Sequence, residues 1–166
     1  MRPRAGLMPD RVPVMCQLSL GHYFLHAGPG AVEIWHDTAA FGDALLALQQ
    51  RYAFDGILVN LPGRDPRWRD HIAAVDRQGP DTVVRWVNGA VTTVPPDDNP
   101  HVRTAGLGAS DHRTFAGVDP DDLFYIEPHG PFGATLVRDG GIPPWQFDTL
   151  RYVRQRAPGV SVHGEV

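Results

Sequence analysis

The sequence predicts an α/β fold built on parallel strands, and three apolar runs carry this expectation. Two of them, Val12 to Leu20 and Phe54 to Leu61, flank a helical pattern that extends from Asp37 to Tyr52. Strand, helix and strand at this spacing are typical of a βαβ unit, whose two strands run parallel. A second helical pattern, Pro144 to Ala157, precedes the third run, Val160 to Val166, which we expect to be a further parallel strand.

The composition is that of a globular protein and excludes several function classes. Hydrophobic residues make up 42% of the 166 residues and charged residues 20%, with a net charge of −4. The charges are scattered without a basic stripe, which argues against nucleic acid as a partner. No apolar run is long enough to cross a bilayer, and no secretory leader precedes the first strand, so we expect a cytoplasmic location and no membrane partner.

The inventory of reactive side chains narrows the chemistry further. All fifteen basic residues are arginines, so neither a Schiff-base lysine nor a P-loop lysine is available within this sequence. Cys16 is the single cysteine, which excludes an internal disulfide and a Cys-rich zinc site. We expect Cys16 to be a small buried hydrophobe in the middle of the first strand.

Local signals define the elements between the strands. Asp37-Thr38 predicts the N-cap of the first helix, whose apolar face comprises Phe41, Ala44, Leu45, Leu48 and Tyr52. A further helix is expected between these two helical patterns, over Pro66 to Gln78, with Trp68, Ile72 and Val75 on one side.

The region from residue 82 to 94 has a different character and predicts a β-hairpin outside the parallel sheet. Asn88-Gly89 separates two β-rich runs, and this dipeptide favours a type I′ turn, which needs positive φ twice. Pro95 to Gly117 follows without periodicity and predicts a long loop of the kind that is often functional.

Several segments, in order, resemble the uroporphyrinogen decarboxylase superfamily. They are Arg11-Val12-Pro13-Val14 with Gly21-His22-Tyr23, then Leu48-Gln49-Gln50-Arg51-Tyr52 with Phe54-Asp55-Gly56-Ile57-Leu58-Val59, and finally Val160-Ser161-Val162-His163-Gly164-Glu165-Val166. The resemblance implies that residues 1–166 form a single domain, the N-terminal portion of a (β/α)₈ TIM barrel with an inserted β-hairpin. On this reading the sequence ends before a whole barrel can be built, and the rest of the barrel or another chain would complete it, with a homo-oligomer as one arrangement.

The superfamily includes the haem-pathway decarboxylase and corrinoid-dependent methyltransferases. The decarboxylase carries an Arg-Gln-Ala-Gly-Arg-Tyr segment after its first strand, whose arginines hold substrate carboxylates. Leu18-Ser19-Leu20-Gly21-His22-Tyr23 stands in that place here, and the family's aspartate after the second strand is absent, since Asn60-Leu61-Pro62 follows it. The resemblance therefore favours the methyltransferase branch, which uses zinc and a corrinoid, although the zinc ligands of that branch have no counterpart in this sequence.

The barrel architecture selects the candidate site, because active sites of such barrels lie at the carboxyl ends of the strands. Glu165 is the candidate acid or base and His22 the second candidate catalytic residue, with Gln17, Asn60 and His163 as candidate ligand-binding residues. Other readings remain open: Glu165 and His163 could form a hydrogen-bonded pair, Asn60 could cap a turn, and His22 with His26 has the i, i+4 spacing of a metal pair. No metal ligand set is assigned within the sequence.

Three functions are carried forward. The first is methyl transfer between a corrinoid and a thiol or related acceptor, with a small-molecule substrate bound by this part of the barrel. The second is decarboxylation of a tetrapyrrole or another acid. The third is a non-catalytic module that completes its sheet by pairing with another chain, since exposed strand edges invite such pairing.

Overall fold

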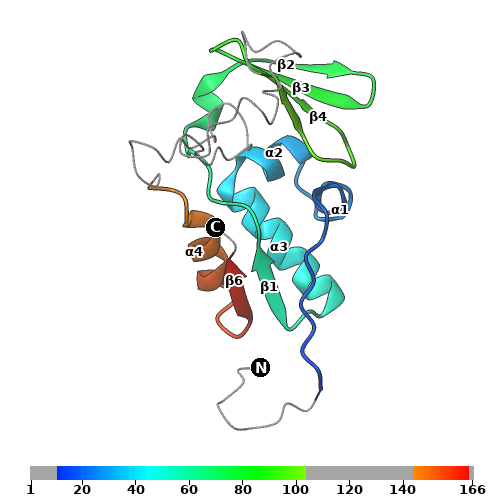
Figure 1. Ribbon diagram of the computed structural model, residues 1–166, viewed down its shortest axis with the longest axis vertical. Helices are drawn as coiled ribbons and strands as arrows, with labels where there is room; N and C mark the ends of the chain where they lie inside the picture. The colour runs from blue at the N-terminus through cyan, green and yellow to red at the C-terminus, as the bar shows by residue number, and fades with distance from the viewer. Residues whose placement is uncertain (1–10, 104–143, 165–166) are drawn as a thin grey trace, which may run out of the picture.

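Two sheets and four α-helices make up the part of the chain that the structure, a computed structural model, describes, namely residues 11–103 and 144–164. One sheet is parallel and the other antiparallel, so the expected mixed α/β class is confirmed, while the described residues do not close into a barrel (Figure 1). In chain order the elements are α1 Leu20–His26, α2 Ala31–His36, α3 Thr38–Tyr52, β1 Gly56–Val59, the 3₁₀ helix η1 Trp68–His71, β2 Ile72–Gln78, β3 Asp81–Trp86, β4 Val91–Val94, β5 His101–Arg103, α4 Asp148–Arg156 and β6 Ser161–Gly164.

The helix α3 forms as its apolar pattern predicts. Asp37 caps its first turn, because the carboxylate accepts hydrogen bonds from the amides of Ala39 and Ala40 at 3.0 and 3.1 Å. Its buried face contains Phe41, Ala44, Leu45 and Leu48, whereas Tyr52 at the last turn is exposed. The helix ends where Ala53 adopts a left-handed conformation with φ of 53°.

The parallel sheet pairs β1 with β6, and α4 directly precedes β6 in the chain. The register joins Gly56 to Ser161 and Val59 to Gly164, which confirms the predicted strand at the carboxyl end of the sequence over Ser161–Gly164. Ile57, Val59 and Val162 pack into the same apolar cluster as the buried residues of α3 and α4. The two helices therefore cover one face of this sheet.

Close backbone approaches hold α4 in place. A Cβ atom on Gly42 would meet the ring of Tyr152, and one on Gly63 would overlap the carbonyl oxygen of Trp145. Tyr152 also donates a hydrogen bond to Asp43 at 2.8 Å, and Val153 is completely buried between the helices. These contacts fix the last helix and strand against the first half of the fold.

The predicted first strand, Val12 to Leu20, is wrong as a strand. Residues 12–19 form no ladder, α1 begins at Leu20, and the segment meets the start of β1 through Asp55, whose amide donates to Val14 at 2.8 Å. Val12 is 82% exposed and Cys16 is exposed too, so Cys16 is not the buried hydrophobe that we expected. The apolar run alone misled, because a parallel strand needs a continuous partner ladder and this segment makes only isolated bonds.

The predicted helix over Pro66 to Gln78 is also wrong beyond its first turn. Only η1 is helical, and β2 follows immediately and pairs antiparallel with β3 along its length. The Gly79-Pro80 loop makes this possible, since Gly79 has φ of 63° at the first loop position, where a type II′ turn requires glycine. Tertiary pairing thus overrides a helical spacing that rested on only a few apolar residues.

The hairpin of residues 82 to 94 is confirmed, but its turn differs from the expected type I′. Only Gly89 has positive φ, at 83°, and its amide donates to the carbonyl of Trp86, while the amide of Trp86 donates to the carbonyl of Ala90. This is the pattern of a three-residue loop, in which a turn is followed by a left-handed glycine at a bulge. The long loop predicted from Pro95 also contains β5, which pairs with β4, and its part from residue 104 lies outside the described residues.

The antiparallel sheet has an apolar cluster of its own. Trp68, Val84, Trp86 and Ala90 are buried there, with the indole of Trp86 donating to Thr92 at 2.8 Å. This sheet lies beside α2, on the side of the molecule toward which β1 points (Figure 1).

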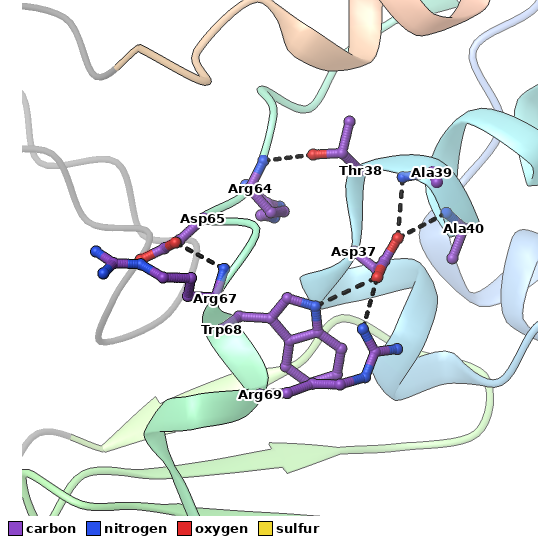
Figure 2. A network of polar contacts seen from close by, with 9 residues as sticks. All are labelled: Asp37, Thr38, Ala39, Ala40, Arg64, Asp65, Arg67, Trp68 and Arg69. Atoms are coloured by element: carbon purple, nitrogen blue, oxygen red, sulfur yellow. Dashed lines mark hydrogen bonds and ion pairs between the residues drawn. The ribbon is translucent and has the colours of Figure 1, made fainter.

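A polar junction links the two parts of the fold (Figure 2). Asp37 accepts hydrogen bonds from the indole of Trp68 at 3.4 Å and from Arg69 at 2.9 Å, in addition to capping α3. Arg64 donates through its amide to the hydroxyl of Thr38 at 2.7 Å. The N-terminus of α3 is therefore tied directly to the segment that leads into the antiparallel sheet.

Candidate functional site

Two of the predicted ligand-binding residues, Gln17 and Asn60, line one pocket at the carboxyl end of β1. The pocket has a volume of about 530 Å³, within the usual range for small-molecule sites. Its lining comes from the segment before α1, from α2, from the residues after β1 and from the connection between β4 and β5: Gln17, Leu18, Ser19, Leu20, Trp35, Asn60, Leu61, Asn99 and Pro100.

The position of the pocket follows from the direction of β1. Open parallel sheets bind ligands at the carboxyl ends of their strands, because the connecting segments diverge there and leave a crevice. Asn60 is the first residue after β1, and Leu61 after it is 4% exposed. The strand therefore delivers a polar side chain to the pocket and buries the next residue beneath it.

The lining is polar without being charged. Gln17, Asn60 and Asn99 each supply a carboxamide and Ser19 supplies a hydroxyl, while leucines, Trp35 and Pro100 provide apolar surface. Each carboxamide both donates and accepts hydrogen bonds. Among the described lining residues none is an acid, a histidine or an arginine, so these side chains are suited to binding and orienting a ligand rather than to proton transfer.

A buried arginine supports the tryptophan of the pocket. Arg64 is 6% exposed, its Nε donates to the carbonyl of Trp35 at 2.7 Å, and its guanidinium lies 5.4 Å from the centroid of the Trp35 ring. The main chain of Arg64 is bound to Thr38 at the start of α3. Trp35 is thus fixed from behind and from the main chain, which preorganises this wall of the pocket.

Electrostatics at the adjoining junction keep one group charged and another neutral. Burial acts to raise the pKa of Asp37, but hydrogen bonds from Arg69, the Ala40 amide and Trp68 outweigh it and leave the pKa below its ordinary value. His36 is 4% exposed and stacks on Trp68 with ring centroids 5.3 Å apart. Burial, and then the charge of Arg64, lowers the pKa of His36 to about 3.

His22, the predicted catalytic residue of the first segment, does not line the pocket. Its Nε2 lies 2.9 Å from the hydroxyl of Tyr52, and its ring centroid lies 4.5 Å from that of His26. Burial, and then the nearby His26 and Arg51, lowers the pKa of His22. The histidine therefore belongs to an aromatic cluster between α1 and the end of α3.

His163, predicted from the last strand, is not among the described residues that line the pocket with Gln17 and Asn60. His163 is exposed on β6, opposite Leu58 in the register, and its Nε2 lies 2.8 Å from the hydroxyl of Ser161. Glu165, the candidate acid or base, lies outside the described residues. The pair that we expected from their two-residue spacing is thus represented only by His163.

Trp35, Asn99 and Pro100 line the pocket but lie outside the strand ends from which the candidate residues were chosen. The sequence offered no functional signal at Trp35, and Asn99 and Pro100 fall in the segment expected to be a loop. The richness of that segment in proline and asparagine indicated a loop, and its length favoured function, but nothing in it indicated which residues would reach β1. Their role depends on how the inserted sheet is placed, which no local pattern encodes.

The described residues contain no group of three or more histidine, cysteine or acidic side chains that could hold a metal ion. Within the same ranges, none of the helices has both the length and the apolar character that crossing a membrane requires. Comparison with known protein families, curated proteins and solved structures finds no match for this chain.

Proposed function

We propose that this chain binds a small methyl donor or acceptor, as the N-terminal part of a barrel enzyme of the corrinoid-dependent methyltransferase type. The observation that carries the proposal is the pocket at the carboxyl end of β1, lined by Gln17 and Asn60. The residues that resemble the uroporphyrinogen decarboxylase superfamily supply the strand and the segment on which these two side chains stand. The described residues bind and orient the ligand in this proposal.

The charge of the lining favours methyl transfer over decarboxylation of a tetrapyrrole. A substrate with several carboxylates needs bidentate arginine partners, because each desolvated carboxylate is costly unless it is paired. The described lining contains no arginine, and nearby Arg64 is bound behind Trp35. A neutral methyl ether or a thiol needs no such counter-charge.

Neither zinc nor a corrinoid is assigned to the described residues, because they offer no ligand set for the metal. Zinc would supply thiol deprotonation in an enzyme of this type. The side chains of the pocket contribute hydrogen bonds from Gln17, Asn60 and Asn99 and apolar contact from Trp35, which position a ligand.

Ligand-observed saturation-transfer NMR on the 166-residue chain tests the proposal with three probes. Guaiacol is a neutral methyl ether, mercaptoethanol is a neutral thiol, and uroporphyrin is a tetrapyrrole with many carboxylates. We expect signals from the two neutral probes that weaken in Gln17→Ala and Asn60→Ala. Gln78→Ala, an exposed glutamine at the end of β2, is the matched control and leaves these signals unchanged.

Two results would contradict the proposal. One is the absence of any signal from both neutral probes. The other is binding of uroporphyrin that Asn60→Ala abolishes, since this would place a polycarboxylate in the pocket and favour the decarboxylase over the methyltransferase.

A further inference from the structure

The connection between β4 and β5 lies directly on the beginning of α1. A Cβ atom built on Gly21 would overlap the carbonyl oxygen and carbon of Asp97, so the two backbones touch without a side chain between them. Only glycine permits this approach, because every other residue would push the connection away. The antiparallel sheet is thereby seated against the same segment that carries Gln17.

The same connection forms one wall of the pocket. Asn99 and Pro100 line it, two and three residues beyond the contact with Gly21. Paired strands hold the connection on both sides, since Val94 is buried at the end of β4 and His101 pairs with Thr93. Within the connection the amide of Asn99 donates to the carboxylate of Asp98 at 2.7 Å. A sheet outside the parallel core thus delivers a carboxamide to the pocket.

Three carboxamides from three separate segments then surround one space. Gln17 precedes α1, Asn60 follows β1, and Asn99 comes from the antiparallel sheet. A carboxamide presents a donor and an acceptor side by side, which matches the edge of another carboxamide or of a lactam. A carboxylate in the same place would find neutral donors but no positive side chain among the described lining residues, so the cost of desolvating its charge would not be offset.

We propose that the inserted antiparallel sheet sets the ligand choice of the pocket, and that the pocket selects an uncharged ligand with a carboxamide or lactam edge. The inference rests on the proposed function in that it uses the same pocket. The inference adds the class of ligand and the element that recognises it, namely the connection between β4 and β5. Asn99 is the specificity-determining residue. Gly21 is the positioning residue, because its lack of a side chain lets the connection between β4 and β5 reach the pocket.

Benzamide and benzoate form a matched pair of probes, because they differ only in the carboxamide and the carboxylate. We expect the chain to bind benzamide at least about tenfold more tightly than benzoate, which corresponds to about 1.4 kcal/mol. Asn99→Arg should reverse this preference, since it places a bidentate cation in the wall of the pocket. Gln78→Arg adds the same charge on β2, away from the pocket, and should leave the preference unchanged.

A second pair of variants tests the seat of the connection. Gly21→Ala should weaken benzamide binding roughly tenfold or more, because the connection must move away from α1. Gly159→Ala is its control, since a Cβ atom there meets nothing within 4 Å. Circular dichroism shows whether Gly21→Ala folds; the exposed Asn99 carries the test independently if it does not.

The outcomes separate this inference from the proposed function. Equal binding of benzamide and benzoate, or an Asn99→Arg variant that behaves like Gln78→Arg, would overturn the inference while guaiacol binding through Asn60 upholds the pocket. Loss of all binding, guaiacol included, would overturn both. Reversal in Asn99→Arg alone, together with weakened binding in Gly21→Ala and not in Gly159→Ala, supports the inference.

Discussion

At the scale of single residues, the carboxylate of Asp37 both caps α3 and binds the segment that leads into the antiparallel sheet. One oxygen accepts from the amides of Ala39 and Ala40, and the other accepts from Trp68 and Arg69. Asp37→Ala should therefore lower the free energy of unfolding by about 2–3 kcal/mol, through the lost cap and the unpaired indole. Asp37→Asn keeps one acceptor oxygen for the cap but places an NH2 donor opposite the indole and Arg69, so it should cost about 1–2 kcal/mol, less than Asp37→Ala.

Urea unfolding of both variants measures the difference. Equal losses in Asp37→Ala and Asp37→Asn would show that the bonds from Trp68 and Arg69 to the second oxygen, and not the cap, carry the stabilisation. The sequence predicted the capping function, since Asp-Thr before an apolar helical face is a local signal. It could not predict the second function, because Trp68 and Arg69 are about thirty residues further along the chain and meet Asp37 only after folding.

His36 makes the stability of the protein depend on pH. Its Nε2 is buried without a hydrogen-bond partner among the residues that the structure describes, and its pKa is lowered to about 3 by burial and then by Arg64. In the unfolded chain the imidazole takes up a proton near pH 6.5, so between that pH and about 3 the unfolded state binds the additional proton. Stability is therefore complete above about pH 6.5 and declines as the pH falls through this window.

Comparison with His36→Phe, which retains a ring between Trp68 and Trp86, isolates this effect. The wild-type chain should lose about 2 kcal/mol of unfolding free energy between about pH 7 and pH 5 that the variant retains. His163→Gln, at an exposed position on β6, is the control and should keep the wild-type slope. Identical pH profiles for the wild type and His36→Phe would contradict the buried neutral state of this histidine.

At the scale of elements, local signals predicted the pieces whose partners are near in sequence or whose periodicity is long. The helix α3 has a cap and an apolar face over four turns, and the hairpin β3–β4 has its Asn-Gly loop. The errors fall where an element depends on a distant partner. β2 exists because β3 pairs with it, and the segment before α1 lacks a continuous ladder despite its apolar run.

The loop of that hairpin gives a prediction at this scale. Gly89 has φ of 83°, a conformation that costs an L-residue with a Cβ atom about 1–2 kcal/mol. Gly89→Ala should reduce the unfolding free energy by this amount, whereas Gly89→Asn should cost less, because asparagine tolerates the left-handed region. Gly159→Ala, at an open position without positive φ, should have little effect, and thermal or urea unfolding orders the three variants. A loss in Gly89→Asn that exceeds the loss in Gly89→Ala would contradict the backbone explanation.

At the scale of the whole molecule, two of the five candidate residues selected from the sequence line the pocket. The rule that ligands bind at the carboxyl ends of parallel strands selected Asn60, which follows β1 and lines the pocket. Gln17 lines it too, although the strand from which the rule selected it is not formed. His22, selected by the same rule, lies in α1 with its ring against Tyr52 and is not among the lining residues of this pocket. Asn99 could not be predicted from the sequence, because it comes from a sheet whose position depends on the backbone contact at Gly21.

Trp68 joins the apolar cluster of the antiparallel sheet to α2, and this arrangement predicts how the molecule unfolds. Trp68 is 5% exposed, packs with Trp86 in the cluster of the antiparallel sheet, and stacks on His36 of α2. Trp68→Ala removes a large side chain from a small cluster, at a cost of about 3–5 kcal/mol. Because α3, β1 and α4 share a separate cluster, we expect hydrogen exchange to accelerate in β2 to β5 while the amides of α3 and β1 keep their protection. Val87→Ala, at a side chain that is 62% exposed, should leave both regions protected. Accelerated exchange throughout the chain in Trp68→Ala would instead mean that the two clusters unfold as one cooperative unit. The connection that carries Asn99 would then be as stable as the parallel sheet.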